Sequence, residues 1–128
     1  MIYLDSSVAL AHLLGEERAP PDAIWREPLV ASRLLAYEVW TRVNARKLGR
    51  SHGEHVRALI DRVALLELVQ PVLERALEPF PSAVRTLDAL HLASIEFLRG
   101  QGQRVALATY DARMADAART LGIPLWEG

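Results

Sequence analysis

Short apolar runs alternate with longer helical patterns along this chain. A run of three or four apolar residues bounded by turn-forming residues is typical of a strand buried on both faces of a sheet. The pattern predicts four such strands and a short edge strand, at residues 2–4, 29–31, 66–69 and 105–108, and at 123–125.

Between these runs, apolar residues recur with the spacing of a helix that buries one face. Glycines stand where several of these patterns stop, as they commonly do at helix ends. The predicted helices cover about residues 6–14, 33–48, 53–65, 86–98 and 112–121, with short helical pieces at 22–25 and around Pro79 and Pro81.

Strands that alternate with helices imply crossover connections and a parallel sheet covered on both faces. We therefore predict an α/β fold of three layers, α/β/α, around a mainly parallel sheet of four to five strands. The length, 128 residues of which 51% are hydrophobic, is that of one domain with a core of its own, so we expect a single domain over residues 1–128.

Composition narrows the function classes. The chain has no cysteine, which excludes disulfides, thiolate zinc sites and cysteine nucleophiles. A net charge of -1 gives no overall positive field toward nucleic acid, although a local basic surface is compatible with it. No stretch approaches the ~18 apolar residues of a membrane span, and we expect a cytoplasmic protein with no membrane association.

Two aspartates stand at predicted strand ends, 106 residues apart in the sequence: Asp5 after the first strand and Asp111 after the fourth. In open α/β sheets, ligands bind at the carboxyl ends of the strands. The pattern thus places both carboxylates at one crevice. Helix capping is the alternative interpretation, because aspartate is a preferred N-cap residue.

Two further acids lie on faces that are otherwise apolar. Glu38 falls between Leu34 and Leu35 on the helical wheel, and Asp88 shares a face with Leu92. A buried carboxylate needs a compensating partner. An ion pair of Glu38 with Arg42, or the helix amides and Arg85 for Asp88, would each suffice. A divalent cation shared by all four acids would explain all of them with one cause, and Mg²⁺ and Mn²⁺ prefer oxygen ligands.

The same residues carry a family resemblance. The segments "YLDSSVALAHLL", "YEV", "LDALHLAS" and "ATYDARMADAARTLGIP" resemble, in order and spacing, a PIN domain, specifically the VapC-type toxin ribonucleases of toxin–antitoxin modules. The resemblance implies a PIN-like fold and an endoribonuclease dependent on Mg²⁺ or Mn²⁺, with a homodimer and a cognate antitoxin as partners. It also implies a site of Asp5, Glu38, Asp88 and Asp111, flanked by the hydroxyl residues Ser6 and Thr109.

In this hypothesis the metal activates water for attack on an RNA phosphodiester and neutralises the charge that develops on the phosphate. Asp5, Asp88 and Asp111 would be its ligands, directly or through water. Glu38 would bind a second metal or orient the attacking water. Ser6 and Thr109 would support the ligands through hydrogen bonds. We expect the antitoxin to lay an apolar helix between the N-terminal helices.

Other polar and aromatic residues have plainer interpretations. We interpret His91 as packed and hydrogen-bonded, Asp116 as a surface residue, Glu96 as solvated, and the tryptophans as core residues. The one basic concentration is either a surface that follows RNA phosphates or a solvated helix face. It contains Arg42, Arg46, Lys47 and Arg50.

Two other classes of protein remain as alternatives. A phosphoaspartyl enzyme also begins with an acid after its first strand, but it needs a second acid two residues later, where this chain has Ser7. A non-catalytic PIN-like scaffold that binds RNA or protein would need none of the four acids, all of which are present.

Overall fold

The computed structural model describes residues 1–127, which contain one sheet of four strands. All neighbouring strands are parallel, and Tyr3 lies beside Val30 on one side and Leu107 on the other. The strands are short and mostly apolar, as burial on both faces requires. In spatial order they are β3 (Val63–Leu66), β2 (Leu29–Ser32), β1 (Ile2–Leu4) and β4 (Ala106–Ala108).

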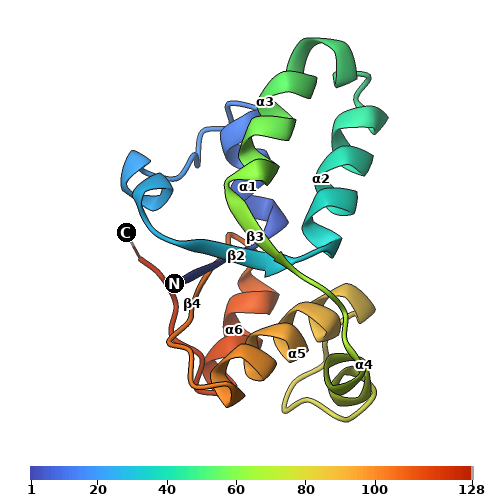
Figure 1. Ribbon diagram of the computed structural model, residues 1–128, viewed down its shortest axis with the longest axis vertical. Coiled ribbons are helices and arrows are strands. Elements are labelled where there is room, and N and C mark those ends of the chain that lie inside the picture. Colours follow the sequence, from blue (N-terminus) through green and yellow to red (C-terminus); the bar gives the residue numbers. More distant parts are fainter. Residues whose placement is uncertain (128) are drawn as a thin grey trace.

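Helices cover both faces of the sheet, which Figure 1 shows nearly edge-on. The predicted three-layer α/β/α fold with a parallel sheet is therefore confirmed. One layer consists of α1 (Ser6–Leu13), α2 (Leu34–Ala45) and α3 (Gly49–Asp61), and the other of α4 (Gln70–Ala76), α5 (Thr86–Gly100) and α6 (Ala112–Thr120), while a 3-10 helix, η1 (Asp22–Arg26), precedes β2.

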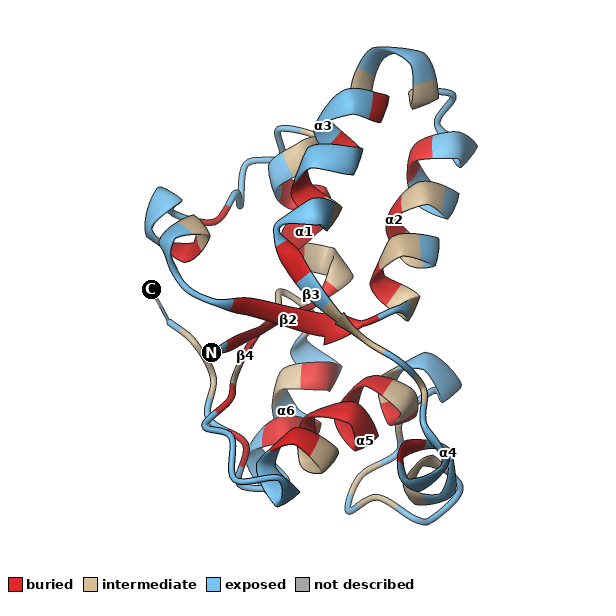
Figure 2. Ribbon diagram, viewed as in Figure 1, coloured by how far each residue is buried: buried red, intermediate tan, exposed pale blue. Residues whose placement is uncertain are grey.

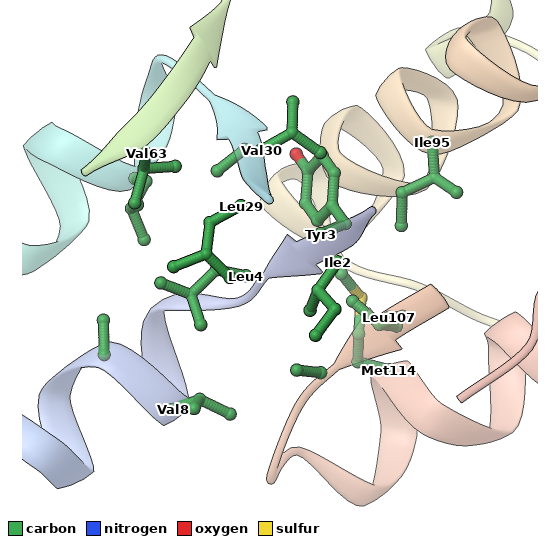
Figure 3. Packing of buried hydrophobic residues seen from close by; sticks show 14 of the residues in the cluster. Ile2, Tyr3, Leu4, Val8, Leu29, Val30, Val63, Ile95, Leu107 and Met114 are labelled. Atoms are coloured by element: carbon green, nitrogen blue, oxygen red, sulfur yellow. The ribbon is translucent and has the colours of Figure 1, made fainter. Parts of the chain in front are cut away.

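The core lies between the sheet and the inner faces of the helices (Figure 2). The side chains of the central strand β1 are enclosed by those of β2 and β4, with Met114 of α6 and Ile95 of α5 close by (Figure 3). Tyr3 and Leu107 are fully buried. The middle of the sheet is thus a rigid base for residues that follow the strand ends.

The predicted third strand and the segment after it are shifted in the structure. β3 begins at Val63, because Val63 pairs with Leu29 and Leu66 with Ser32. Both 63–66 and 66–69 are apolar enough for a strand, so only pairing to β2 selects the register. Pro71 then starts α4, a helix that ends before Pro79, in agreement with the preference of proline for the first helical turn.

The second and third helices also differ from the prediction. α2 ends at Ala45, because Lys47 adopts a left-handed backbone with φ of 58° and the Leu48 N–H donates to Val43 O. Gly49 therefore opens α3 instead of closing α2. The two helices form a hairpin that extends away from the sheet (Figure 1).

The predicted edge strand at 123–125 is reduced to one parallel bridge, between Leu107 and Leu125. Leu107 N–H donates to Pro124 O, and Trp126 N–H donates to Leu107 O. Pro124 has no N–H to extend the ladder. No helix within residues 1–127 combines the length and the apolar character needed to span a lipid bilayer.

Candidate active site

Two aspartates stand where adjacent strands end. Asp5 follows β1 directly, and Asp111 comes three residues after the end of β4, the parallel neighbour of β1. The Asp5 N–H donates to Ala108 O at 3.0 Å, which holds the two strand ends together. Both carboxylates therefore reach the edge of the sheet where α/β proteins bind ligands.

Both aspartates are also helix N-caps. Asp5 Oδ2 accepts from the Ser7 N–H at 3.4 Å, at the start of α1. Asp111 Oδ1 accepts from the Arg113 and Met114 N–H groups at 2.9 and 3.3 Å, at the start of α6. The capping interpretation is thus right, but it uses one oxygen of each carboxylate and leaves the other available.

Two hydroxyl groups fix the orientation of Asp5. Ser7 Oγ and Thr109 Oγ1 donate to its Oδ2 at 2.6 and 2.8 Å. Each hydroxyl oxygen accepts a backbone N–H in turn, from Tyr110 at 2.9 Å and from Asp111 at 3.0 Å. The Asp5 side chain is buried in this network, and it cannot change rotamer without breaking the link between the two strand ends.

Glu38 enters from α2 and is bound on both oxygens. His91 Nε2 lies 2.6 Å from Oε1, and Ser6 Oγ donates to Oε2 at 3.4 Å. His91 belongs to α5, on the opposite side of the sheet from α2. Burial alone lowers the pKa of His91, but its hydrogen bond to Glu38 and the charge of that residue outweigh burial, so the pKa of His91 is raised.

Asp88 lies in the first turn of α5. Its Oδ2 accepts from the Arg85 N–H at 3.4 Å, and the Arg85 guanidinium stands 4.0 Å away. Burial raises the pKa of Asp88, and the charges of Asp111 and Asp5 raise it further, against the Arg85 hydrogen bond. The negative charges of the two strand-end aspartates thus repel the Asp88 carboxylate.

All four acids line one cavity of about 460 Å³, together with two arginines that approach from different segments. Asp5, Asp88 and Asp111 share one feature: within residues 1–127, one carboxylate oxygen of each accepts hydrogen bonds and the other accepts none. The wall of the cavity is formed by Asp5, Ser6, Ser7, Leu10, Glu16, Arg18, Glu38, Arg42, Asp88, Tyr110 and Asp111.

The donor chemistry of this cavity fits a hard divalent cation. Carboxylate oxygens are the ligands that Mg²⁺ and Mn²⁺ prefer, and the mutual repulsion of the aspartates is what such an ion relieves. Among residues 1–127, no three His, Cys, Asp or Glu side chains already stand in a metal-binding arrangement. The acids therefore share a cavity in which an ion would contact part of the set through water, as Mg²⁺ commonly does.

Comparison with known proteins now assigns the family. A family model described as the PIN domain matches residues 2–120. The chain belongs to the PIN-domain family. Among curated relatives of this PIN domain, Ribonuclease VapC46 of Mycobacterium tuberculosis (strain ATCC 25618 / H37Rv) is 39% identical, covering 95% of this chain and 93% of the relative. Ribonuclease VapC47 of strain CDC 1551 / Oshkosh is 31% identical, with the same coverage.

Solved structures show the same PIN fold. Mycobacterium tuberculosis VapC20, described as a Sarcin-Ricin loop cleaving toxin, superposes with a TM-score of 0.69 at 20% identity, covering 91% of this chain and 95% of that one. A toxin–antitoxin complex from Klebsiella pneumoniae gives 0.66 at 17% identity and 88% coverage of each chain. The two structures show that the fold is shared. The curated relatives confirm the resemblance to VapC-type PIN domains and do not favour the scaffold or the phosphoaspartyl alternative.

The PIN domain brings together the acids that the sequence singled out. Asp5, Glu38, Asp88 and Asp111 share the cavity wall, and Ser6 stands beside Glu38. The alternative explanation for Glu38, an ion pair with Arg42, does not apply within the described residues, where Glu38 pairs with His91. That the four acids act as metal ligands and catalytic residues stays a prediction.

Residues outside the site mostly match their plainer interpretations. His91 is buried and hydrogen-bonded, Asp116 is exposed beside Arg119, and the three tryptophans pack against the core. The prediction for Glu96 is wrong: it is not freely solvated but pairs with Arg75 of α4 at 3.0 Å, since α4 packs on α5. The predicted basic residues are exposed: Arg42 lies on α2 beside the acidic cavity, and Arg46, Lys47 and Arg50 lie at the turn from α2 into α3.

Three residues of the site were missed by the sequence analysis. Arg18 reaches the cavity from the loop after α1, with its guanidinium 4.6 Å from the centre of the Tyr110 ring. Ser7 orients Asp5, and Tyr3 supports His91 from β1. A polar side chain in the apolar first strand was the available signal for Tyr3, whereas nothing in the sequence places Arg18 against Tyr110.

Proposed function

We propose that this PIN domain is an endoribonuclease dependent on Mg²⁺ or Mn²⁺ and acts as the toxin of a type II toxin–antitoxin module. One observation carries the proposal: carboxylates that follow β1 and β4 and extend from α2 and α5 line a single cavity. The relatives named as ribonucleases, 39% and 31% identical over nearly the whole chain, support the reaction class. A cytoplasmic location stays a prediction that follows from an RNA substrate.

In this proposal Asp5, Asp88 and Asp111 hold the ion with the oxygens that face the cavity, directly or through water. When bound, the ion supplies an activated water molecule and neutralises charge on the cleaved phosphate. The protein supplies orientation: Ser7 and Thr109 prevent Asp5 from rotating, and the α6 amides do the same for Asp111. Glu38 presents Oε2 to the cavity and orients the attacking water.

Arg18 and Arg42 complete the proposed site as phosphate-binding residues. Both line the cavity among the acids, so each would face the RNA phosphate as it approaches the ion. The guanidinium of Arg18 rests on Tyr110, which restricts its conformations before RNA binds. A cationic group on either side of the phosphate offsets the repulsion between RNA and the acidic cavity.

We propose that the RNA strand continues along α2. Glu38 and Arg42 are four residues apart and therefore share a face of α2, and Arg46 follows at the C-cap of that helix. Lys47 and Arg50 extend this basic surface around the exposed turn into α3. Phosphates that leave the cavity would follow this face, which makes binding dependent on salt.

A cognate antitoxin is the proposed protein partner, supported by the likeness of the fold to a protein solved as a toxin–antitoxin complex. A second cavity of about 340 Å³ adjoins the site between α1 and α2. It shares Ser6, Glu38 and Arg42 with the acidic cavity and is otherwise largely apolar, with Leu10 and Leu34 among its walls. An apolar helix seated there, as predicted from the sequence, would close access to Glu38.

We also propose a homodimer. Leu77 is 88% exposed, and Val69 and Leu73 are exposed as well, all three on α4 or at its ends. Exposed apolar side chains gathered in this way are uncommon on a monomer. A second copy of the chain is the proposed occupant, since most soluble oligomers are symmetric assemblies of identical chains.

Cleavage of RNA by purified protein tests the proposal. Wild type should cleave with Mg²⁺ or Mn²⁺ and stop on addition of EDTA, and Asp5→Asn and Asp88→Asn should be inactive. Full activity of either variant, or activity in EDTA, would reject the metal site. Failure to bind Mn²⁺ would instead favour a scaffold, so calorimetric titration with Mn²⁺ belongs to the same experiment.

A further inference from the structure

A chain of buried hydrogen bonds runs from β2 to the site. The Ser32 N–H donates to Tyr3 Oη at 2.9 Å, Tyr3 Oη lies 2.7 Å from His91 Nδ1, and His91 Nε2 lies 2.6 Å from Glu38 Oε1. Tyr3 and His91 are 0% and 1% exposed, so water does not substitute for these partners. The chain links both outer layers of the fold through the central strand.

Its direction follows from the first bond, because a backbone N–H can only donate. The Tyr3 oxygen accepts from Ser32, and burial raises the pKa of Tyr3, so its hydroxyl keeps a hydrogen to donate to His91 Nδ1. His91 Nδ1, 2.7 Å away, is in place to accept this hydrogen. At the other end of the ring, a carboxylate oxygen of Glu38 can only accept, so the 2.6 Å contact places a hydrogen on Nε2. Nδ1 of the neutral ring is therefore an acceptor, and its one hydrogen resides on Nε2.

The hydrogen on Nε2 is directed at Glu38. In the neutral ring it is the only N–H, and in the cationic ring Nε2 still carries a hydrogen, so Oε1 of Glu38 accepts in either state. Oε2 is the oxygen that remains for the cavity, where Ser6 Oγ is 3.4 Å away. The hydrogen bond from His91 thus selects one rotamer of a side chain that has several rotatable bonds.

We propose that His91 is a positioning residue for Glu38, held in the Nε2–H form by Tyr3 and the Ser32 amide, so that Glu38 offers one defined oxygen to the reaction. This rests on the proposed function insofar as Glu38 takes part in RNA cleavage. His91 itself is absent from the cavity wall and does not contact the substrate.

The tautomer is measured first, without any substrate. Long-range ¹H–¹⁵N NMR correlations of the imidazole, recorded at alkaline pH where the ring is neutral, report which nitrogen carries the hydrogen. Wild type should show it on Nε2. Tyr3→Phe removes the donor to Nδ1 but leaves Glu38 to accept from Nε2, so it should show a larger share of the form with the hydrogen on Nδ1. A hydrogen on Nδ1 in wild type would overturn the proposed direction of the chain, whatever the activity.

Kinetics then separate positioning from a purely structural role. His91→Leu removes the donor, whereas His91→Gln places an amide nitrogen near the position of Nε2. Second-layer partners of metal ligands typically contribute about 10–100-fold, so H91L should lose about that factor in kcat with KM for RNA unchanged, and H91Q should recover most of it. Folding of each variant is checked by circular dichroism. If H91L fails to fold, Y3F still tests the tautomer, and Y3F and H91Q still test the rate.

Glu38→Gln distinguishes this inference from the function on which it rests. If E38Q is inactive while folded H91L retains full kcat, positioning by His91 is wrong and the proposed function stands. If E38Q cleaves as well as wild type, the role of Glu38 in the proposed function is wrong. A loss in H91L that appears only in KM, or that H91Q does not recover, would also reject positioning.

Discussion

Asp5 has two roles that different substitutions separate. It is 7% exposed, caps α1 and accepts hydroxyl hydrogen bonds at 2.6 and 2.8 Å. Asp5→Ala removes the cap, worth about 1 kcal/mol, and leaves two donors that had a charged acceptor, each such bond worth about 1.5–3 kcal/mol. Removal of a buried charge offsets part of this, and we expect a net loss of about 2–4 kcal/mol of folding free energy.

Asp5→Asn should behave differently. The amide oxygen can occupy the Oδ2 position and accept the same hydrogen bonds, while the loss of charge relieves the repulsion that raises the pKa of Asp88. The folding free energy of D5N should therefore stay within about 1 kcal/mol of wild type. Its RNA cleavage should nevertheless be lost, because the oxygen facing the ion is replaced by an NH₂ group that cannot act as a ligand.

Thermal unfolding in EDTA, followed by circular dichroism, measures the difference. At about 3–5 °C per kcal/mol for a chain of this length, D5A should lower Tm by roughly 6–20 °C and D5N by less than about 5 °C. Asp116→Asn, on the exposed face of α6, is the matched control and should change neither Tm nor cleavage. Equal Tm values for D5A and D5N would refute the hydrogen-bond argument. Cleavage of RNA by D5N would show that Asp5 serves only as a helix N-cap and not as a metal ligand.

Three further outcomes are expected. The pKa of Asp88 is raised in the folded protein, so in EDTA the wild type should lose stability relative to Asp88→Asn as pH rises above about 4. Parallel curves of stability against pH for the two proteins would contradict this. Mn²⁺ should raise the Tm of wild type more than that of D88N. Joint replacement of Arg42 and Arg46 by Gln in inactive D5N should reduce the salt dependence of RNA binding, measured by fluorescence anisotropy, by about 0.7 in log–log slope per lost phosphate contact, whereas Arg99→Gln at the far end of α5 should not. Leu77→Glu should halve the mass measured by light scattering without lowering Tm, and an unchanged dimer would show that the interface lies elsewhere.

Two of the acids that line the cavity stand at positions defined by secondary structure. Asp5 and Asp111 follow apolar strands, and the pairing of β1 with β4 brings both to one edge of the sheet. Glu38 and Asp88 were found by a different signal, an acid on an otherwise apolar helix face. The actual partner of Glu38 was not found, because His91 is 53 residues away and meets it only once α2 and α5 dock on the sheet.

The ends of helices and strands were predicted less well, because they too depend on contacts between segments distant in the sequence. The register of β3 depends on its pairing with β2, and the end of α2 depends on a left-handed residue, Lys47, where the sequence offers Gly49 two positions later. The contact of Arg18 with Tyr110 depends on how the loop after α1 folds over the strand ends. Local patterns contain no information on such contacts.

The convergence of three helix starts on one acidic cavity has a consequence for how the protein behaves when magnesium is scarce. The amino ends of α1, α5 and α6 carry partial positive charge next to Asp5, Asp88 and Asp111, so the fold itself tolerates these anions. In the proposed mechanism, removal of the ion therefore leaves the protein inactive but folded, and its activity returns as soon as the ion binds again.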